Sequence, residues 1–224
     1  MSKSILLALL VLLWLPGAKS LAQTPPSAEE IARYKGLHSA AHRNDAATLR
    51  ALLAKGAGPN PRDGAGRTPV HIAAHAAGYA ALKALVAGGA DIKAMDHAHY
   101  DVITIAAVRD DVRMVRLAIE LGGNPKAVTS PYEGTALIAA AHLGHVDVVK
   151  ALIAAGAPLD HVNNIGWTAL LEAIILGDGG KRHIETAKAL VDAGADKSID
   201  DRDGITPLEH AQRRGYDPII EFLK

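Results

Sequence analysis

The sequence predicts an all-α repeat protein, a solenoid of paired antiparallel helices joined by hairpin-like loops. Glycines that each end an apolar helical stretch recur at spacings of 33, 33, 34 and 38 residues. Alanine pairs recur at 33, 33 and 34 residues from Ala40-Ala41 onward, which indicates a second helix ahead of each stretch. Such a unit cannot bury its apolar face alone, so the units must stack. The glycines are Gly56, Gly89, Gly122, Gly156 and Gly194.

The composition suits close-packed helices and excludes several classes of function. Of the 224 residues 43 are alanine, and only 4% are aromatic. Lys+Arg and Asp+Glu both number 24, which argues against a nucleic-acid binder, since that class carries a basic excess. The chain has no cysteine, which excludes disulfides, thiolate metal sites and a cysteine nucleophile.

Residues 1–22 have the pattern of a secretory signal peptide. Lys3 is followed by an unbroken apolar run over 5–15, and Ser20-Leu21-Ala22 offers small residues at a cleavage site. The run is shorter than the roughly 20 residues that a membrane-spanning helix needs. We therefore predict export through the general secretory route and a periplasmic location; an uncleaved membrane anchor is the alternative.

The remainder divides into two parts. Residues 23–35 are predicted to form a linker and an N-terminal capping helix, since Ser27 and Glu30 have the spacing of a capping box. Residues 36–224 hold about six repeat units, of which the two outer ones are partial.

The repeat motifs resemble those of the ankyrin repeat family. The segment 68–74 reads Thr-Pro-Val-His-Ile-Ala-Ala, close to the family signature Thr-Pro-Leu-His-x-Ala-Ala, and Gly-Ala-Asp turns stand at 89–91 and 194–196. Thr68 can cap a helix whose first residue is Pro69. The resemblance implies that His71 makes a hydrogen bond between a loop and the neighbouring repeat. The predicted structural residues are Thr68, Pro69, His71, Gly89, Asp91, Gly156, Gly194 and Asp196.

Three segments depart from the pattern. The third unit lacks the proline and histidine over 101–107, and the hairpin at 130–134 carries one extra residue. The fifth unit is longer by five residues, placed at 177–182, where we expect a loop between two helices. This glycine-rich stretch lacks the spacing of a phosphate-binding loop, so no nucleotide cofactor is predicted.

Two histidine pairs could hold zinc, because residues four apart share one helix face. They are His38 with His42 and His71 with His75. His38 and His71, however, stand at the family's structural histidine position. We therefore predict no metal site and no cofactor.

The candidate binding residues lie on the expected concave face and on the hairpins. The resemblance implies contact positions four and five residues after the signature histidine and in each hairpin before the signature threonine. Tyr, Trp and Arg at such positions are typical of interface hot spots. For Tyr100 and Trp167 the alternative is packing against the adjacent loop. The candidates are Arg67, His75, Tyr100, Arg109, Tyr132, His142 and Trp167.

These features predict a non-catalytic module, monomeric, that binds another protein in the periplasm and assists, stabilises or inhibits it. An immunity protein against a delivered toxin is one alternative, and a membrane-tethered scaffold, if the leader stays attached, is another. Catalysis is not expected, because the chain has no Gly-x-Ser-x-Gly motif and a repeat surface is shallow. No nucleic-acid partner is expected, and no membrane contact after cleavage.

Overall fold

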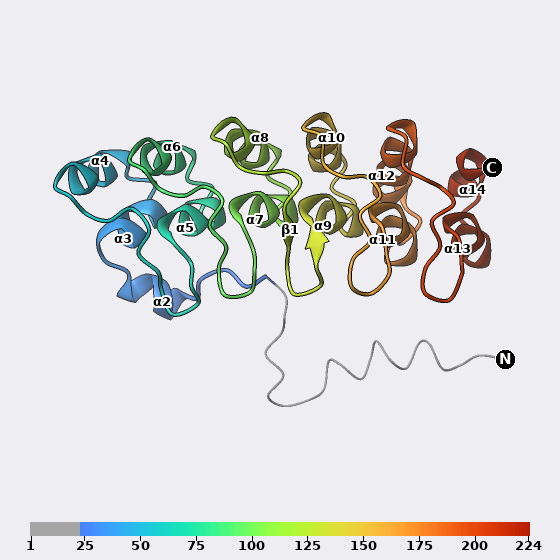
Figure 1. The fold of residues 1–224 in the computed structure, drawn as a ribbon, viewed down its shortest axis with the longest axis horizontal. Helices are drawn as coiled ribbons and strands as arrows, with labels where there is room; N and C mark the ends of the chain where they lie inside the picture. The colour runs from blue at the N-terminus through green and yellow to red at the C-terminus, as the bar shows by residue number, and fades with distance from the viewer. Residues whose placement is uncertain (1–22) are drawn as a thin grey trace, which may run out of the picture.

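The computed structural model describes residues 23–224, so the predicted signal peptide at 1–22 lies outside the described residues. Helix pairs follow one another in a single file, with the first helix of each pair in one layer and the second in another (Figure 1). This confirms the predicted all-α repeat architecture. Within residues 23–224, no helix is both long enough and apolar enough to cross a membrane.

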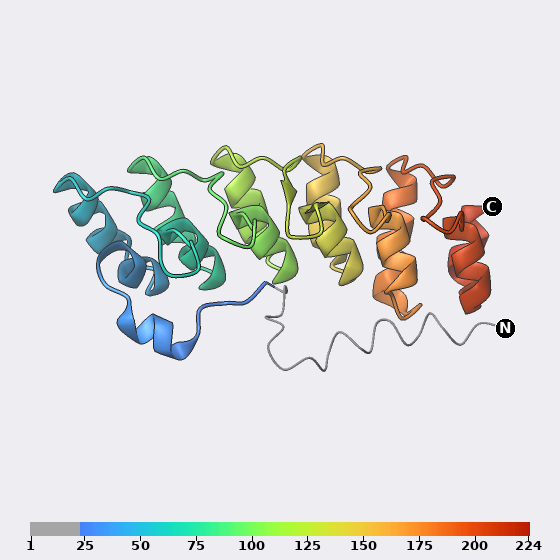
Figure 2. The same ribbon diagram turned by 60° about the horizontal axis from the view of Figure 1, so that its bottom comes forward.

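Each repeat unit contributes one inner helix, on the side of the hairpins, and one outer helix (Figures 1 and 2). The inner helices are α3 (Gly36–His42), α5 (Pro69–His75), α7 (Val102–Val108), α9 (Ala136–His142), α11 (Ala169–Ile175) and α13 (Pro207–Arg214). The outer helices are α4 (Ala46–Ala54), α6 (Tyr79–Ala87), α8 (Val112–Glu120), α10 (Val146–Ala154), α12 (Lys181–Asp192) and α14 (Asp217–Leu223). A short helix, α2 (Ala28–Arg33), precedes them.

The core runs the length of the array between these helices. The alanine pairs of the inner helices are fully buried, which allows adjacent inner helices to approach closely. Leu49 and Leu82, at matching positions of α4 and α6, are also fully buried and fill the space between the layers. The repeat period therefore marks the residues that each unit buries against its neighbours.

The hairpins form a side wall that is tied together by the backbone. Asn164 N donates to the Tyr132 carbonyl at 2.9 Å, and Ser130 N donates to the His99 carbonyl at 2.9 Å. The lengthened hairpin also forms a short antiparallel pair of strands, β1 (Val128–Thr129) and β2 (Gly134–Thr135). We call the surface made by the inner helices and the hairpin residues 61–67, 94–100, 128–135, 161–167 and 199–205 the hairpin face.

The third unit keeps the fold with different residues. Asp101 caps α7 by accepting from Thr104 N at 2.8 Å. The Thr104 side chain, which replaces the signature histidine, lies 2.9 Å from the Thr129 hydroxyl of the next hairpin. The link between repeats therefore survives the loss of the histidine. Burial raises the pKa of Asp101, since the pocket disfavours its charge.

The insertion at 177–182 lies between α11 and α12, as predicted, but only part of it is a loop. Its last two residues begin α12, which has 12 residues where α10 has 9. Two hydrogen bonds hold the loop in place. Asp178 accepts from Gly180 N at 2.8 Å, and the Tyr216 hydroxyl donates to the Gly177 carbonyl at 2.9 Å.

Candidate protein-binding surface

The signature histidine connects consecutive repeats, as predicted. Nδ1 of His71 accepts from Thr68 N at 3.0 Å, and Nε2 donates to the Tyr100 carbonyl of the next hairpin at 3.1 Å. The Thr68 hydroxyl lies 2.9 Å from the same Nδ1, and α5 begins at Pro69. Burial lowers the pKa of His71, so the ring is neutral at neutral pH. Both ring nitrogens serve the fold.

The turns after the outer helices, among them the Gly-Ala-Asp turns at 89–91 and 194–196, are also structural. Gly89, Gly156 and Gly194 have φ of 88°, 78° and 95°, a conformation that favours glycine after a helix. The carboxylate of Asp91 accepts from Lys93 N at 2.9 Å. That of Asp196 accepts in the same way from Ser198 N at 2.8 Å. These side chains fold the turns that follow the outer helices.

The N-terminal helix α2 lies on the hairpin face beside the first units (Figures 1 and 2). It begins at the predicted capping box, since Glu30 N donates to the Ser27 hydroxyl at 3.2 Å. Glu30 also forms an ion pair with Arg67 of the first hairpin. Tyr34 donates to Asp63 at 2.7 Å. The protein's own chain therefore covers this end of the hairpin face.

Three of the predicted contact residues are buried, and the prediction that they meet a partner needs correction. Arg67 is 3% exposed, because Glu30 and Asp63 both pair with its guanidinium. Tyr100 is 6% exposed and packs in the core, so its side chain is not available to a partner. His75 is 8% exposed. Its ring nitrogens have no hydrogen-bond partner among the described residues, and burial lowers its pKa to about 4.

The other four candidates reach the surface. Arg109 and His142 are exposed at the ends of α7 and α9, and Tyr132 is 46% exposed at a hairpin tip. Trp167 is half-buried. The most exposed large apolar side chains of the described residues all fall within one stretch of the chain: Val128, Tyr132, Leu143, Val162 and Ile165.

A buried carboxylate on α11 was not predicted from the sequence. Glu172 is 4% exposed, and its Oε1 accepts from the Asn163 side chain at 3.0 Å. Nδ1 of His142, on the preceding inner helix, lies 3.1 Å from its Oε2 and donates to it. The signal was present in the sequence, since the matching positions of the three preceding units are apolar (Ile72, Ile105 and Ala139), although the two outer units carry Ser39 and His210 there.

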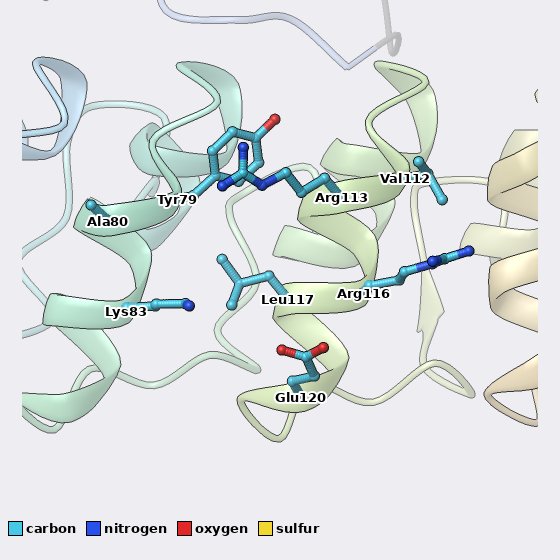
Figure 3. Close-up of a pocket in the computed structure, with 8 residues that line it drawn as sticks. All are labelled: Tyr79, Ala80, Lys83, Val112, Arg113, Arg116, Leu117 and Glu120. Carbon is cyan, nitrogen blue, oxygen red and sulfur yellow. The ribbon is translucent and has the colours of Figure 1, made fainter.

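A hollow on the opposite side of the array lies between α6 and α8 (Figure 3). Its rim includes Lys83, Arg116 and Glu120, and the Arg113 guanidinium lies 4.1 Å from the centre of the Tyr79 ring. The cation–π contact occupies both side chains. The hollow is open, with exposed charged side chains on its rim, and offers no enclosed site for chemistry.

The histidine pairs do not form a metal centre in the described part of the chain. Nε2 of His38 lies 3.0 Å from the Arg67 carbonyl, and His71 is fully engaged as described above. Among residues 23–224, no group of three or more His, Asp or Glu side chains is placed to hold a metal ion.

Comparisons with known proteins agree with this architecture. Models described as ankyrin repeats match residues 37–86 and 103–201. The ankyrin repeat protein YahD of Escherichia coli strain K12 is 39% identical over 93 residues, which cover 41% of this chain and 46% of YahD. The chain thus matches less than half of that relative's length.

Two solved structures align over most of their length. An ankyrin repeat domain from Acinetobacter baumannii is 41% identical, with a TM-score of 0.79 over 84% of this chain and 95% of that one. The ankyrin repeat protein EF0377 is 31% identical, with a TM-score of 0.78 over 85% of this chain and 98% of that one. Ankyrin repeat domains mediate protein–protein interactions. On its motifs, its fold and these relatives, the chain belongs to the ankyrin repeat family.

Proposed function

We propose that this chain is a non-catalytic protein-binding module that acts in the periplasm, where it assists, stabilises or inhibits another protein. The observation that carries the proposal is the position of the exposed apolar side chains. They gather on the hairpins of the fourth and fifth units, at 128–135 and 161–167, and on the end of α9. A monomeric protein exposes few such clusters, and they mark interaction sites.

The fold suits this task physically. The hairpins from 61–67 to 161–167 are joined to one another by backbone hydrogen bonds, and the Arg202 side chain joins the last hairpin to Asn164, so the side chains are presented on a rigid frame. Rigid presentation lowers the ordering cost of binding. A standard interface of about 800 Å² per partner fits on a few adjacent repeats.

The periplasmic location rests on the leader pattern at 1–22. Fractionation should place the protein in the soluble periplasm, and N-terminal sequencing of the exported protein should begin at Gln23. Recovery with the membrane fraction would favour a tethered scaffold instead.

Affinity capture from the native periplasm, with mild cross-linking and a C-terminal tag, tests the binding function. One bait carries Tyr132→Ala and Ile165→Ala, and a matched control carries Lys83→Ala and Arg116→Ala on the opposite side. We expect the wild type and the control to retain a partner that the first variant loses. Equal capture by all three baits would show that the interface lies elsewhere on the protein. No capture by any of them would count against a partner that resides in the periplasm and favour the alternative of an immunity protein.

A further inference from the structure

We propose that the hairpin face of the fourth and fifth units binds a polypeptide segment in which a lysine or arginine stands beside apolar side chains, and that Glu172 receives the cation. This inference rests on the proposed binding function and deepens it, because it names the site and the chemistry of the partner.

The apolar part of the site spans two neighbouring hairpins. Tyr132 is 46% exposed and Ile165 37%. The two hairpins are held together where Asn164 N donates to the Tyr132 carbonyl at 2.9 Å and the Asn164 side chain donates to the Pro131 carbonyl at 3.1 Å. Leu143, 38% exposed, adds an apolar side chain at the end of α9. These positions can take up the apolar side chains of a bound segment.

The first units offer no such surface. There α2 lies on the hairpin face, and Arg67 is already paired with Glu30 and Asp63. A partner that enters the hairpin face therefore meets uncovered apolar side chains in the fourth and fifth units.

Glu172 supplies a negative charge that the protein compensates incompletely. Its two oxygens accept from the Asn163 amide and the His142 ring, and neither Lys nor Arg of residues 23–224 forms an ion pair with it. By contrast, the hairpin carboxylate of Asp63 pairs with Arg67 at 2.7 Å. Each carboxylate oxygen can accept two hydrogen bonds, and a buried charge is costly without a full partner. Glu172 therefore has acceptor capacity and charge to offer a cation.

A cation of the partner can reach the buried Glu172 at the position of the His142 ring. Its side chain is 47% exposed although its Nδ1 reaches the buried carboxylate, so the ring connects Glu172 to the surface next to Leu143. A lysine or arginine that takes the place of the ring pairs a full positive charge with the carboxylate in a charge-assisted hydrogen bond.

The charge around the site favours a basic segment. Glu133, Asp200 and Asp203 are exposed on the hairpins of the fourth and sixth units. Arg202 is exposed between them and donates to the Asn164 carbonyl. On these hairpins acidic side chains outnumber the single arginine, and complementary charge steers the cationic part of a partner toward them. Arg109 and Arg213 are exposed on the same face, at the ends of α7 and α13.

The test uses a displayed library of random peptides selected on three immobilised proteins: the wild type, Glu172→Gln and Glu120→Gln. The glutamine at 172 keeps the shape of the side chain and an oxygen for Asn163, so the fold is preserved, which an unchanged melting temperature checks. Glu120 is exposed on the opposite layer and serves as the control.

We expect the wild type and Glu120→Gln to enrich peptides with a lysine or arginine beside apolar residues. A synthetic peptide of that sequence should bind Glu172→Gln about tenfold more weakly or worse. Enriched peptides without a basic residue, or a basic preference that Glu172→Gln retains, would overturn the cation site while the binding function stands. Failure of the wild type to enrich any peptide would overturn the proposal of a linear segment as the occupant; the periplasmic capture tests the binding function independently.

Discussion

Glu30 of the N-terminal helix forms an ion pair with Arg67 in the first hairpin, 37 residues further along the chain. The pair explains why a residue at a partner-contact position is only 3% exposed. It also means that α2 is fixed to the hairpin face and does not simply precede the repeats. The uncovered hairpin face consequently begins further along the array.

Removing this ion pair should loosen α2. We expect Glu30→Gln to lower the free energy of unfolding by about 1 kcal/mol, because Arg67 loses one of its two carboxylate partners. Hydrogen exchange at residues 28–33 should become faster. Glu29→Gln is the matched control, since Glu29 and Arg33 form an exposed pair whose loss should change stability by only a few tenths of a kcal/mol. Equal effects of the two changes would contradict this role for Glu30.

The signature histidine, His71, should contribute more to the free energy of unfolding than an exposed polar residue does. We expect His71→Ala to destabilise the fold by about 2–4 kcal/mol in urea unfolding, because it removes the buried hydrogen bonds of the ring to Thr68 and to the Tyr100 carbonyl and opens a cavity. His97→Ala, at an exposed hairpin position, is the control and should change little. A loss below about 1 kcal/mol for His71→Ala would show that the link between repeats does not depend on this ring.

His75 should make stability depend on pH in the acid range. Its pKa is about 4 in the folded state, against about 6.5 when the chain is unfolded. Between these values only the unfolded chain takes up the proton, so the free energy of unfolding falls as the pH falls. From pH 7 to pH 5, the stability of the wild type relative to His75→Leu should drop by about 2 kcal/mol. A constant difference between the two proteins would contradict the burial of a neutral ring.

Asp101 should have the opposite pH dependence to an ordinary paired carboxylate. Burial raises its pKa, so the folded state holds the proton more tightly than the unfolded chain. Its contribution is therefore favourable below the unfolded pKa of about 3.9 and is lost as the pH rises through the folded value. Both bonds from Thr104 go to Oδ1, which an amide oxygen can replace. We expect Asp101→Asn to be at least as stable as the wild type at pH 7 and to lose that advantage in acid; an advantage that grows in acid would contradict this sign.

The repeat fold was predictable because its signals are local and periodic. Thr68 and Pro69 act within one helix start, His71 stands at a fixed place after them, and the glycines end helices at intervals of 33 to 38 residues. The burial of Arg67 was not predictable from its place in the repeat, because it depends on Glu30 in a segment outside the period. Tyr100 has the residue type of a contact but packs inward. Glu172 could have been found, since it places a carboxylate where the three preceding units carry apolar side chains, but its bond to His142 joins two helices and requires the structure.

Site-specific photocross-linking in the native periplasm tests the central claim most directly. A photoreactive residue placed at Ile165, on the hairpin face, should give a discrete adduct with a partner protein, whereas the same residue at Lys83, on the opposite side, should give none. An adduct from position 83 and none from position 165 would contradict the claim that the hairpins of the fourth and fifth units form the binding surface.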